Sequence, residues 1–498
     1  MVAYAEGLTE EVKWDSWVLE DPFAEEIWSE RAVAVESLEG GDSIVVIDRQ
    51  ESQHSPSTPV LYKVTKSQQV AWSLRSKLVS GSPFGIAVNE MFDNAYVIVS
   101  STKAGGSESD VHVLRFSGIS SNGNPETIQS RVKESLFYTV GTANGVTKLF
   151  GCAINSVNGD VYLTGGTSSS LYGNSQGKGD VIVARLAASG EVLTAIQFGT
   201  ANDEFGRAID VNEDATEIVL AVNRNLEDGG SEALMYRLDP TTLELNDGPR
   251  MLVNYGAKPL FTVNDIALGR PAADRSVTTF MTGKALVIPD RDVDMFVHIF
   301  AVLPNDYSEV PVYVDGMSNG KGMDQGVSIR VGSDGNAYCI GSTESVDGAR
   351  QALLLVISPT GRILLLTGRE DGSNMTQLER PTAVSLTEED GRTAVRYVGY
   401  MKGLNGNRAS FGFVKPASGA IKPFEGFGEV VEEAAAGNPE DNTITEENGE
   451  SHVGLNKNTI IIIASTAVGA LAVAGIVAMV VITYGSSRRR RTSAPQQQ

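Results

Sequence analysis

Residues 179–186 read GDVIVARL, and close variants of this short stretch return along the chain. Its apolar residues follow an aspartate and are interrupted near the end by a polar arginine, a pattern typical of a β-strand bounded by turn residues. Seven copies occur: TPVLYKV (58–64), SDVHVLRF (109–116), GDVIVARL (179–186), SEALMYRL (231–238), VDMFVHIF (293–300), RQALLLVI (350–357) and RASFGFVK (408–415). A strand that recurs in this way predicts a repeat architecture.

The residues on either side of this strand complete one repeating unit. Upstream, GCAINSVNGDVYLTGGT (151–167) predicts two strands joined at Asn158-Gly159, because Asn-Gly between apolar runs favours a hairpin turn. Downstream, GEVLTAIQFGT (190–200) predicts one more strand. One unit is therefore a set of four short strands.

A small residue marks the first strand of each unit. The markers are Ala34, Ala87, Ala153, Ala208, Ala267, Ser328 and Ala383. They recur at intervals of roughly 60 residues, which is long enough for one four-stranded blade. Such a unit cannot bury both faces alone, whereas a closed ring of units buries each face on the next. We therefore expect an all-β fold, a seven-bladed β-propeller over residues 31–428, rather than β-sandwiches with accidental similarity.

The N-terminal segment, residues 1–30, contains one further candidate strand. This candidate is VKWDSWVLE at residues 12–20. We expect this strand to pair with the last blade and to close the ring. A start without regular structure is the alternative.

The run from Phe150 to Thr200 resembles the SBBP-type β-propeller repeat. It has a small residue before an Asn or Asp, a hairpin of the form G-D-V-Y-L-T-G, the strand D-V-I-V-A-R-L, and a closing Phe-Gly. Residues 141–199 carry the resemblance best, and residues 200–254 and 318–371 carry it less fully. The resemblance implies the fold, and it implies no shared catalytic motif, since one fold hosts many functions.

A second stretch, FGRAIDVNEDATEIVLAV (205–222), is similar to the FG-GAP repeat of integrin α-type propellers. That family holds calcium in a D-x-D/N-x-D-G loop, and Asp210, Asn212 and Asp214 have the required spacing. Oxygen ligands at alternate positions suit a hard cation. Ala215 stands where the family has glycine. We predict a calcium ion as the one candidate cofactor, with a solvated acidic hairpin as the alternative.

The C-terminal part of the chain predicts a membrane anchor. Residues 458–487 form an uncharged run, and a bilayer needs roughly 20 apolar residues as a helix. We expect a transmembrane helix over residues 458–484. Small residues spaced four apart, such as Ser465 and Gly469, also permit a transmembrane-helix dimer.

The charges on either side of this helix predict its orientation. Arg488 to Arg491 begin a short basic tail, residues 485–498, and basic residues next to a span mark the cytoplasmic side. The preceding segment, residues 429–457, is an acidic stalk that we expect to be disordered. The propeller is thus predicted to lie on the non-cytoplasmic side of a plasma membrane or endomembrane.

The start of the chain does not fit this orientation, because residues 1–30 contain no visible secretory signal peptide. Two explanations stay open. The natural protein can have a leader that precedes the sequence given, or tail-anchored insertion can leave the propeller in the cytosol. The second explanation would carry four arginines across the membrane, against the charge rule.

Composition excludes some functions and leaves others. The net charge of −22 excludes nucleic acid as a partner. Neither H-E-x-x-H nor a P-loop is present, and we identify no catalytic residue. The connections between second and third strands are long and polar, for example residues 166–180, and should share one rim. This rim should carry many carboxylates, including Asp110, Asp180, Asp228, Asp292, Asp294 and Asp347. Loops on a rigid scaffold are the usual place for binding residues.

We therefore predict a single-pass membrane protein whose propeller binds a protein or glycan ligand on this loop rim, for example in adhesion. The alternative is a propeller-based carbohydrate-active hydrolase or lyase. The sequence also predicts one glycosylation site and two unpaired cysteines. Asn374 in Asn-Met-Thr is a glycosylation candidate, and the only cysteines, Cys152 and Cys339, fall in distant units and should stay unpaired.

Overall fold

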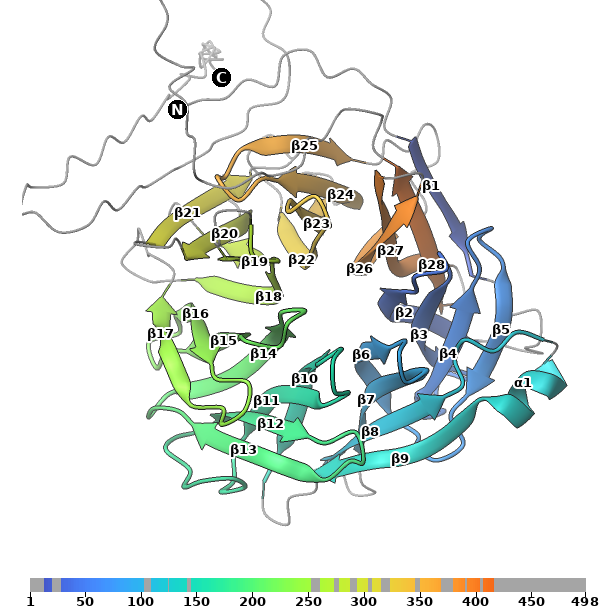
Figure 1. Ribbon diagram of the computed structural model, residues 1–498, viewed down its shortest axis with the longest axis horizontal. Coiled ribbons are helices and arrows are strands. Elements are labelled where there is room, and N and C mark those ends of the chain that lie inside the picture. The colour runs from blue at the N-terminus through green and yellow to red at the C-terminus, as the bar shows by residue number, and fades with distance from the viewer. Residues whose placement is uncertain are drawn as a thin grey trace, which may run out of the picture.

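The computed structural model of the chain is a closed ring of antiparallel sheets (Figure 1). It describes residues 13–19, 28–102, 109–123, 125–140, 145–251, 260–272, 277–286, 293–302, 307–314, 323–344, 350–368, 379–389, 392–403 and 406–415. These residues form seven four-stranded sheets. The predicted all-β, seven-bladed β-propeller is confirmed.

Each blade is a meander in which neighbouring strands are antiparallel and the first strand lies nearest the axis. Blades 1 to 3 are β2(Ser29–Ser37), β3(Ser43–Gln50), β4(Thr58–Val64), β5(Val70–Arg75); β6(Ser82–Asn89), β7(Asn94–Thr102), β8(Ser109–Ser117), β9(Lys133–Val140); and β10(Thr147–Ile154), β11(Val161–Thr167), β12(Asp180–Leu186), β13(Val192–Phe198). Blades 4 to 6 are β14(Asp203–Val211), β15(Ile218–Asn225), β16(Ser231–Leu238), β17(Leu245–Met251); β18(Phe261–Leu268), β19(Val277–Ala285), β20(Asp294–Val302), β21(Tyr307–Val314); and β22(Gln325–Val331), β23(Ala337–Glu344), β24(Arg350–Ile357), β25(Ile363–Gly368). Blade 7 is β26(Glu379–Glu389), β27(Arg392–Gly403), β28(Gly406–Lys415) and β1(Lys13–Val18), and a short helix, α1(Pro125–Arg131), joins β8 to β9.

All seven copies of the stretch that defines the repeat form the third strand of a blade, from β4 in blade 1 to β28 in blade 7. In β12 the apolar side chains are buried, and the polar Arg185 near its end stays half-buried. Asn158-Gly159 forms the predicted turn between β10 and β11, with Gly159 at a φ of 78°.

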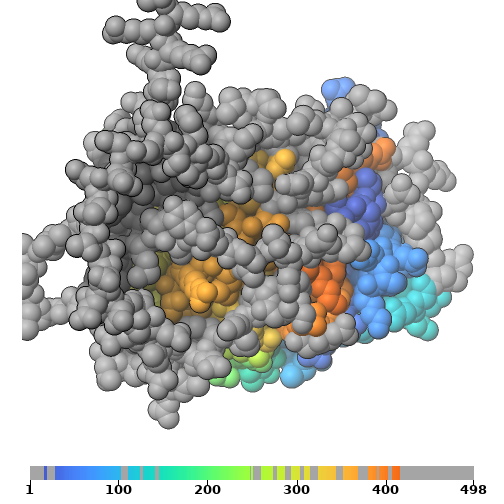
Figure 2. All heavy atoms as spheres, turned by 90° about the horizontal axis from the view of Figure 1, so that it is seen from above, coloured from blue at the N-terminus to red at the C-terminus, as the bar shows by residue number. Residues whose placement is uncertain are grey.

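The N-terminal strand closes the ring, as predicted. β1 pairs with β28 over six residues, from Lys13 opposite Lys415 to Val18 opposite Ser410. Seen from above, blue N-terminal residues lie directly beside orange residues of blade 7 (Figure 2). Leu19 continues the pairing through a backbone hydrogen bond from its N–H to the carbonyl of Ala409. Leu19 is 2% exposed. The last blade is therefore built from both ends of the propeller.

The hydrophobic core lies between the blades. The described residues form seven apolar clusters, and each cluster is shared by two neighbouring blades. Val35 and Tyr62 of blade 1, for example, pack in one cluster with Leu19 and Phe411 of blade 7. Burying apolar surface supplies roughly 25 cal/mol per Å². Each blade thus depends on both neighbours for stability.

Every innermost strand contains a β-bulge at the same place. The register shifts by one extra residue in all seven of these strands, and the extra residues are Val33, Phe84, Phe150, Arg207, Asn264, Val327 and Thr382. A bulge adds an unpaired residue and redirects its side chain. We call these seven residues the bulge ring. The bulges also show that the small-residue markers at Ala87, Ala153 and Ala267 are two positions out of step with those at Ala34, Ala208, Ser328 and Ala383.

The ring has two different ends. At one end lie the connections between second and third strands and those between blades, because Ser29 at the start of β2 pairs with Gln50 at the end of β3. We call this end the loop face. At the other end, the turn face, lie the turns within blades and the connection from β8 to β9 that contains α1. The bulge ring is nearer the loop face, since five bulges lie in the first half of their strands and the other two, at Val33 and Arg207, lie at the midpoint.

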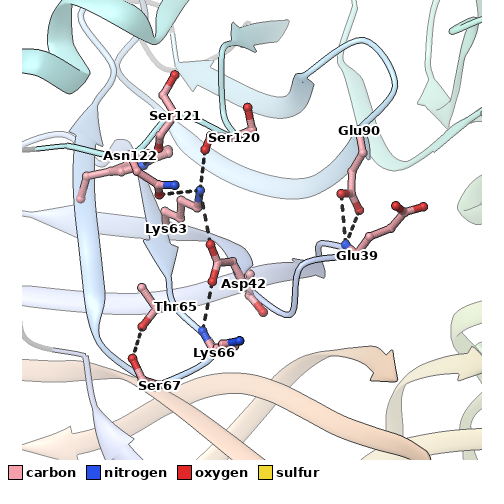
Figure 3. Close-up of polar contacts among 12 residues, drawn as sticks. Glu39, Asp42, Lys63, Thr65, Lys66, Ser67, Glu90, Ser120, Ser121 and Asn122 are labelled. Atoms are coloured by element: carbon pink, nitrogen blue, oxygen red, sulfur yellow. Dashed lines mark hydrogen bonds and ion pairs between the residues drawn. The ribbon is translucent and has the colours of Figure 1, made fainter. Parts of the chain in front are cut away.

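Polar contacts on the turn face join neighbouring blades (Figure 3). The buried Lys63 donates to the carbonyl of Ser120 at 2.8 Å and to Oδ1 of Asn122 at 3.0 Å, and its Nζ lies 3.4 Å from Asp42. Glu90 of blade 2 accepts the backbone N–H of Glu39 at 2.8 Å. Burial raises the pKa of Glu90. The polar and charged groups of these turn residues are therefore paired with one another.

The turn at Ala215 gives a first prediction. Ala215 has a φ of 51°, and Gly41 occupies the corresponding turn of blade 1 with a φ of 81°. A left-handed conformation strains any residue with a Cβ but not glycine. Ala215→Gly should therefore raise the free energy of unfolding by about 1 kcal/mol in urea titrations.

Gly41→Ala is the matched control. A Cβ at residue 41 would meet Lys66 at 3.4 Å, an ordinary contact, so backbone strain alone should lower the stability by a similar amount. Equal stability of the parent and Ala215→Gly would show that the turn adopts another conformation.

Several predicted segments lie outside the described residues. They are most of residues 1–30, the end of the propeller range after residue 415, Asn374, the stalk at 429–457, the transmembrane helix at 458–484 and the tail at 485–498. In the part of the chain that the structure describes, no helix is long and apolar enough to span a bilayer.

Candidate functional site

One long connection of the loop face is built around buried polar groups. Asp180, fully buried at the start of β12, accepts the backbone N–H of Gln176 at 3.0 Å and the side-chain amide of Gln197 at 2.8 Å. The same amide group of Gln197 holds the carbonyl of Ser169 and accepts the N–H of Leu171. The connection from β11 to β12 is therefore a fixed loop, and Asp180 positions it instead of facing a ligand.

The other carboxylates expected on this rim differ in exposure. Asp228 is exposed and accepts the N–H of Gly230, and Asp110 and Asp294 are half-buried. Asp292 and Asp347 lie outside the described residues. The rim is therefore less uniformly acidic than the sequence suggests.

A charged cluster lies at the ring axis. Nη1 of Arg330 in β22 is 2.9 Å from Oδ2 of Asp265 in β18, and its Nη2 is 3.5 Å from Oε1 of Glu36 in β2. Blades 1 and 6 are separated by blade 7 in the ring, so this arginine links two blades that are not adjacent. The side chains of Arg330, Glu36 and Asp265 keep 33%, 27% and 18% exposure. The three groups thus combine restricted solvation with opposite charges, a common property of functional sites.

Asp265 is the best-anchored member of this cluster. Its Oδ2 also accepts the hydroxyl of Ser328 at 2.8 Å and the N–H of Ile329 at 3.0 Å. Glu36 has fewer partners, and burial raises its pKa, although Arg330 opposes the shift. The cluster therefore contains one firmly held carboxylate and one that takes up a proton more readily.

The predicted calcium ligands have separate surroundings. Asp210 accepts the N–H of Val211 at 2.9 Å and the N–H of Leu268 in the next blade at 2.8 Å. Asn212 is buried, and its Oδ1 accepts the N–H of Thr216 within the turn. Asp214 is exposed. Two of the three side chains thus have protein partners, and calcium at this turn stays a prediction.

Among the described residues no group of three or more His, Cys, Asp or Glu side chains is arranged to hold a metal ion. Cys152 and Cys339 are both free thiols, as expected from their distant blades. Burial raises the pKa of each thiol to about 12, so neither is a ready nucleophile.

Asp210 gives a pH-dependent prediction. Burial raises its pKa from 3.8 to about 6. A raised folded-state pKa contributes stability below the unfolded pKa, and that contribution is lost as the pH rises through about 6. Solvent at this half-buried site reduces the contribution to about 1 kcal/mol. Asp210→Asn should therefore remove this part of the fall in unfolding free energy between pH 5 and pH 7.

Urea titrations at pH 5, 6 and 7 measure this slope, and Asp214→Asn, which changes an exposed carboxylate in the same turn, should leave it intact. A slope that is the same in the Asp210→Asn variant as in the parent would show that Asp210 is not desolvated in the folded ring.

Sequence reasoning identified Asp210 for another reason and missed Glu36, Asp265 and Arg330. A signal was present. At the position of Glu36, Asp210 and Arg330, three residues after the bulge, the other blades have alanine or serine, as at Ala153 and Ser385. A charge at an innermost position that elsewhere holds a small residue points to the axis.

No family model matches this chain, and no curated protein matches it either. The SBBP-type and FG-GAP resemblances therefore stay predictions. Three similar solved structures are distant in sequence. An α-L-arabinanase from Penicillium chrysogenum, bound to arabinobiose, is 10% identical, with 80% of this chain and 97% of that chain covered at a TM-score of 0.43.

Two further structures complete the comparison. The β-propeller domain of a protease from Pyrococcus furiosus is 7% identical over 79% of this chain and 97% of its own, at a TM-score of 0.41. A sialidase from Trypanosoma rangeli, in complex with the inhibitor DANA, is 10% identical over 80% of this chain and 59% of its own, at a TM-score of 0.35. This likeness concerns the fold alone and transfers no activity to this chain.

Proposed function

We propose that this protein is a single-pass membrane protein that uses the loop face of its propeller to bind a ligand outside the cytosol, for example in adhesion. The observation that carries the proposal is where the propeller ends. Lys415, the last residue of β28, pairs with Lys13 and lies 3.8 Å from Glu389 at the end of β26. The described chain therefore leaves the ring at the turn face.

This exit fits a membrane anchor beneath the turn face. The segment after Lys415 leads to the acidic residues 429–457 and then to the uncharged residues 458–484. An anchor on that side leaves the loop face directed away from the bilayer. The turn-face residues Lys63, Asp42 and Asn122 are occupied with one another, whereas the loop face carries the long polar connections.

Membrane extraction tests the anchor. The full chain, expressed in cells, should remain in the membrane fraction after alkaline carbonate treatment, because a transmembrane helix is held by the hydrophobic effect. Deletion of residues 458–484 should release the protein into the soluble fraction. Release of the parent chain by carbonate would refute the transmembrane proposal.

A carbohydrate-active hydrolase or lyase is the second candidate, and the axial cluster favours it. Glycoside hydrolysis needs two carboxyl groups, one of which is protonated. Glu36, whose pKa is raised, and Asp265, which is held by Arg330, are the available pair. Incubation with a panel of oligosaccharides would reveal activity, which Glu36→Gln should abolish. Absence of turnover across the panel would leave ligand binding as the function.

A further inference from the structure

Aromatic side chains gather where the bulge ring approaches the loop face. Phe84 of blade 2 meets Phe150 of blade 3 edge to face, with ring centroids 6.1 Å apart. Phe150 in turn lies 5.4 Å from Phe205 of blade 4. Phe84 remains 38% exposed, although it comes from an innermost strand. Three blades thus build one partly open apolar surface, which we call the aromatic platform: Phe84, Phe150 and Phe205.

An arginine lies directly over this platform. The guanidinium carbon of Arg207, the bulge residue of blade 4, is 5.5 Å from the ring centre of Phe150. Arg207 is half-buried, and burial lowers its pKa, opposed by the charge of Asp265. Its side chain remains cationic because arginine does not deprotonate in proteins. The site therefore holds a positive charge that is poorly solvated.

Arg207 differs from other arginines of the neighbouring strands. Arg185 and Arg224 each lie 2.6 Å from a carboxylate, that of Asp160 and that of Glu204. Within the described residues no ion pair joins Arg207 to a carboxylate, and Asp265 is instead bonded to Arg330. A half-buried cation without an acidic partner is unfavourable unless a bound anion neutralises its charge.

The chemistry next to the platform narrows the class of anion. A guanidinium binds a carboxylate through two parallel hydrogen bonds. An exposed aromatic ring packs against a flat, C–H-rich surface. Gly166 at the end of β11 lies against Phe205, since an added Cβ would be 2.8 Å from its Cβ. The hydroxyl-rich residues 168–170 follow directly, so the border of the platform is polar.

We infer that Arg207 and the aromatic platform bind an acidic sugar unit, with the carboxylate of a uronic acid on the guanidinium and the C–H face of the sugar ring on Phe84. This inference rests on the proposed ligand-binding function and names its ligand class. The hydroxyl groups of residues 168–170 would meet those of the neighbouring sugar. A peptide with a terminal carboxylate supplies the charge but not a flat, hydroxylated ring.

The test uses the full chain in detergent and matched ligands. Hyaluronan hexasaccharide and trigalacturonate are titrated, each beside its carboxyl-reduced form, with a peptide that has a free C-terminal carboxylate as the competing class. The parent chain should bind at least one acidic saccharide about tenfold more tightly than its reduced form, the effect of one charge-assisted contact. Arg207→Gln should abolish this preference.

Two further variants identify the contacts. Phe84→Ala should weaken the acidic and the reduced saccharide alike, because packing on an aromatic ring does not depend on charge. Arg270→Gln is the matched control, since Arg270 is an exposed arginine next to the turn face. It should leave binding unchanged. Thermal unfolding of each variant confirms that it is folded.

Four results would overturn the inference: no binding of any saccharide, equal binding of acidic and reduced forms, an unchanged preference in Arg207→Gln, or stronger binding of the peptide. Equal binding of the acidic and reduced forms, or an unchanged preference in Arg207→Gln, would still mean that the propeller binds saccharides. Neither result would contradict the proposed ligand-binding function. Binding of the peptide alone would also be consistent with the proposed ligand-binding function. Membrane extraction tests the anchor independently of all four.

Discussion

Leu19→Ala should lower the free energy of unfolding by about 3 kcal/mol, as expected for removing a fully buried leucine. Leu19 follows β1, is 2% exposed, and packs in the cluster shared by blades 7 and 1. Its loss opens a cavity at the seam where the two ends of the propeller meet. Trp17, whose ring lies 5.0 Å from that of Phe411, shows that β1 is packed as well as paired. Urea unfolding of the full chain measures the change.

Leu78→Ala is the control for this experiment. Leu78 is 53% exposed, so its truncation should change the unfolding free energy by less than about 0.5 kcal/mol. If Leu19→Ala were as mild as Leu78→Ala, β1 would not be part of the folded ring. Blade 7 would then have only three strands.

Arg330→Met should destabilise the chain by about 2 kcal/mol at pH 7. Removing one partner from a buried ion pair costs about 3 to 5 kcal/mol, and the partial exposure of this cluster reduces that cost. The variant leaves the carboxylates of Asp265 and Glu36 without the cation that lies 2.9 Å and 3.5 Å from them. The loss should shrink as the pH falls, because burial raises the pKa of Glu36 and its carboxyl group then takes up a proton.

Arg270→Met provides the comparison for this second variant. Arg270 lies 2.6 Å from Glu213, and both side chains are well exposed, at 65% and 58%. Such surface pairs contribute less than about 1 kcal/mol. A loss at Arg330 that matches the loss at Arg270, or that does not change with pH, would show that the axial carboxylates are solvated independently of Arg330.

The fold was largely predictable because its units repeat. The third strand is buried on both faces, so its sequence is constrained in every blade, and all seven copies were recognised. The closing strand was predictable because residues 12–20 precede the first blade and can pair with the last one to complete the ring. The bulges were not predicted. Small residues occur both one and three residues after the bulge, so Ala208 and Ala87 satisfied the same sequence pattern at different places in their strands.

The axial site was harder to predict because its residues come from different blades. Glu36 is in blade 1 and Arg330 is in blade 6, and no local pattern predicts that their side chains meet at the axis. The axial residues were missed as candidates, whereas Asp180 was wrongly expected to be one. As an acidic residue before a strand it was expected on the rim, yet its partners Gln176 and Gln197 hold it inside. Local composition does not distinguish a ligand-binding carboxylate from one that fixes a loop.

The display of the propeller outside the cytosol is tested most directly by protease accessibility. The full chain would carry one tag at the N-terminus and another after residue 498, and protease would be added to intact cells or to sealed vesicles of known orientation. We expect a protease on the non-cytoplasmic side to remove the propeller and its tag while the tail at residues 485–498 stays protected. Protection of the propeller from that side, with digestion from the cytoplasmic side, would contradict the proposed orientation and would instead support tail anchoring.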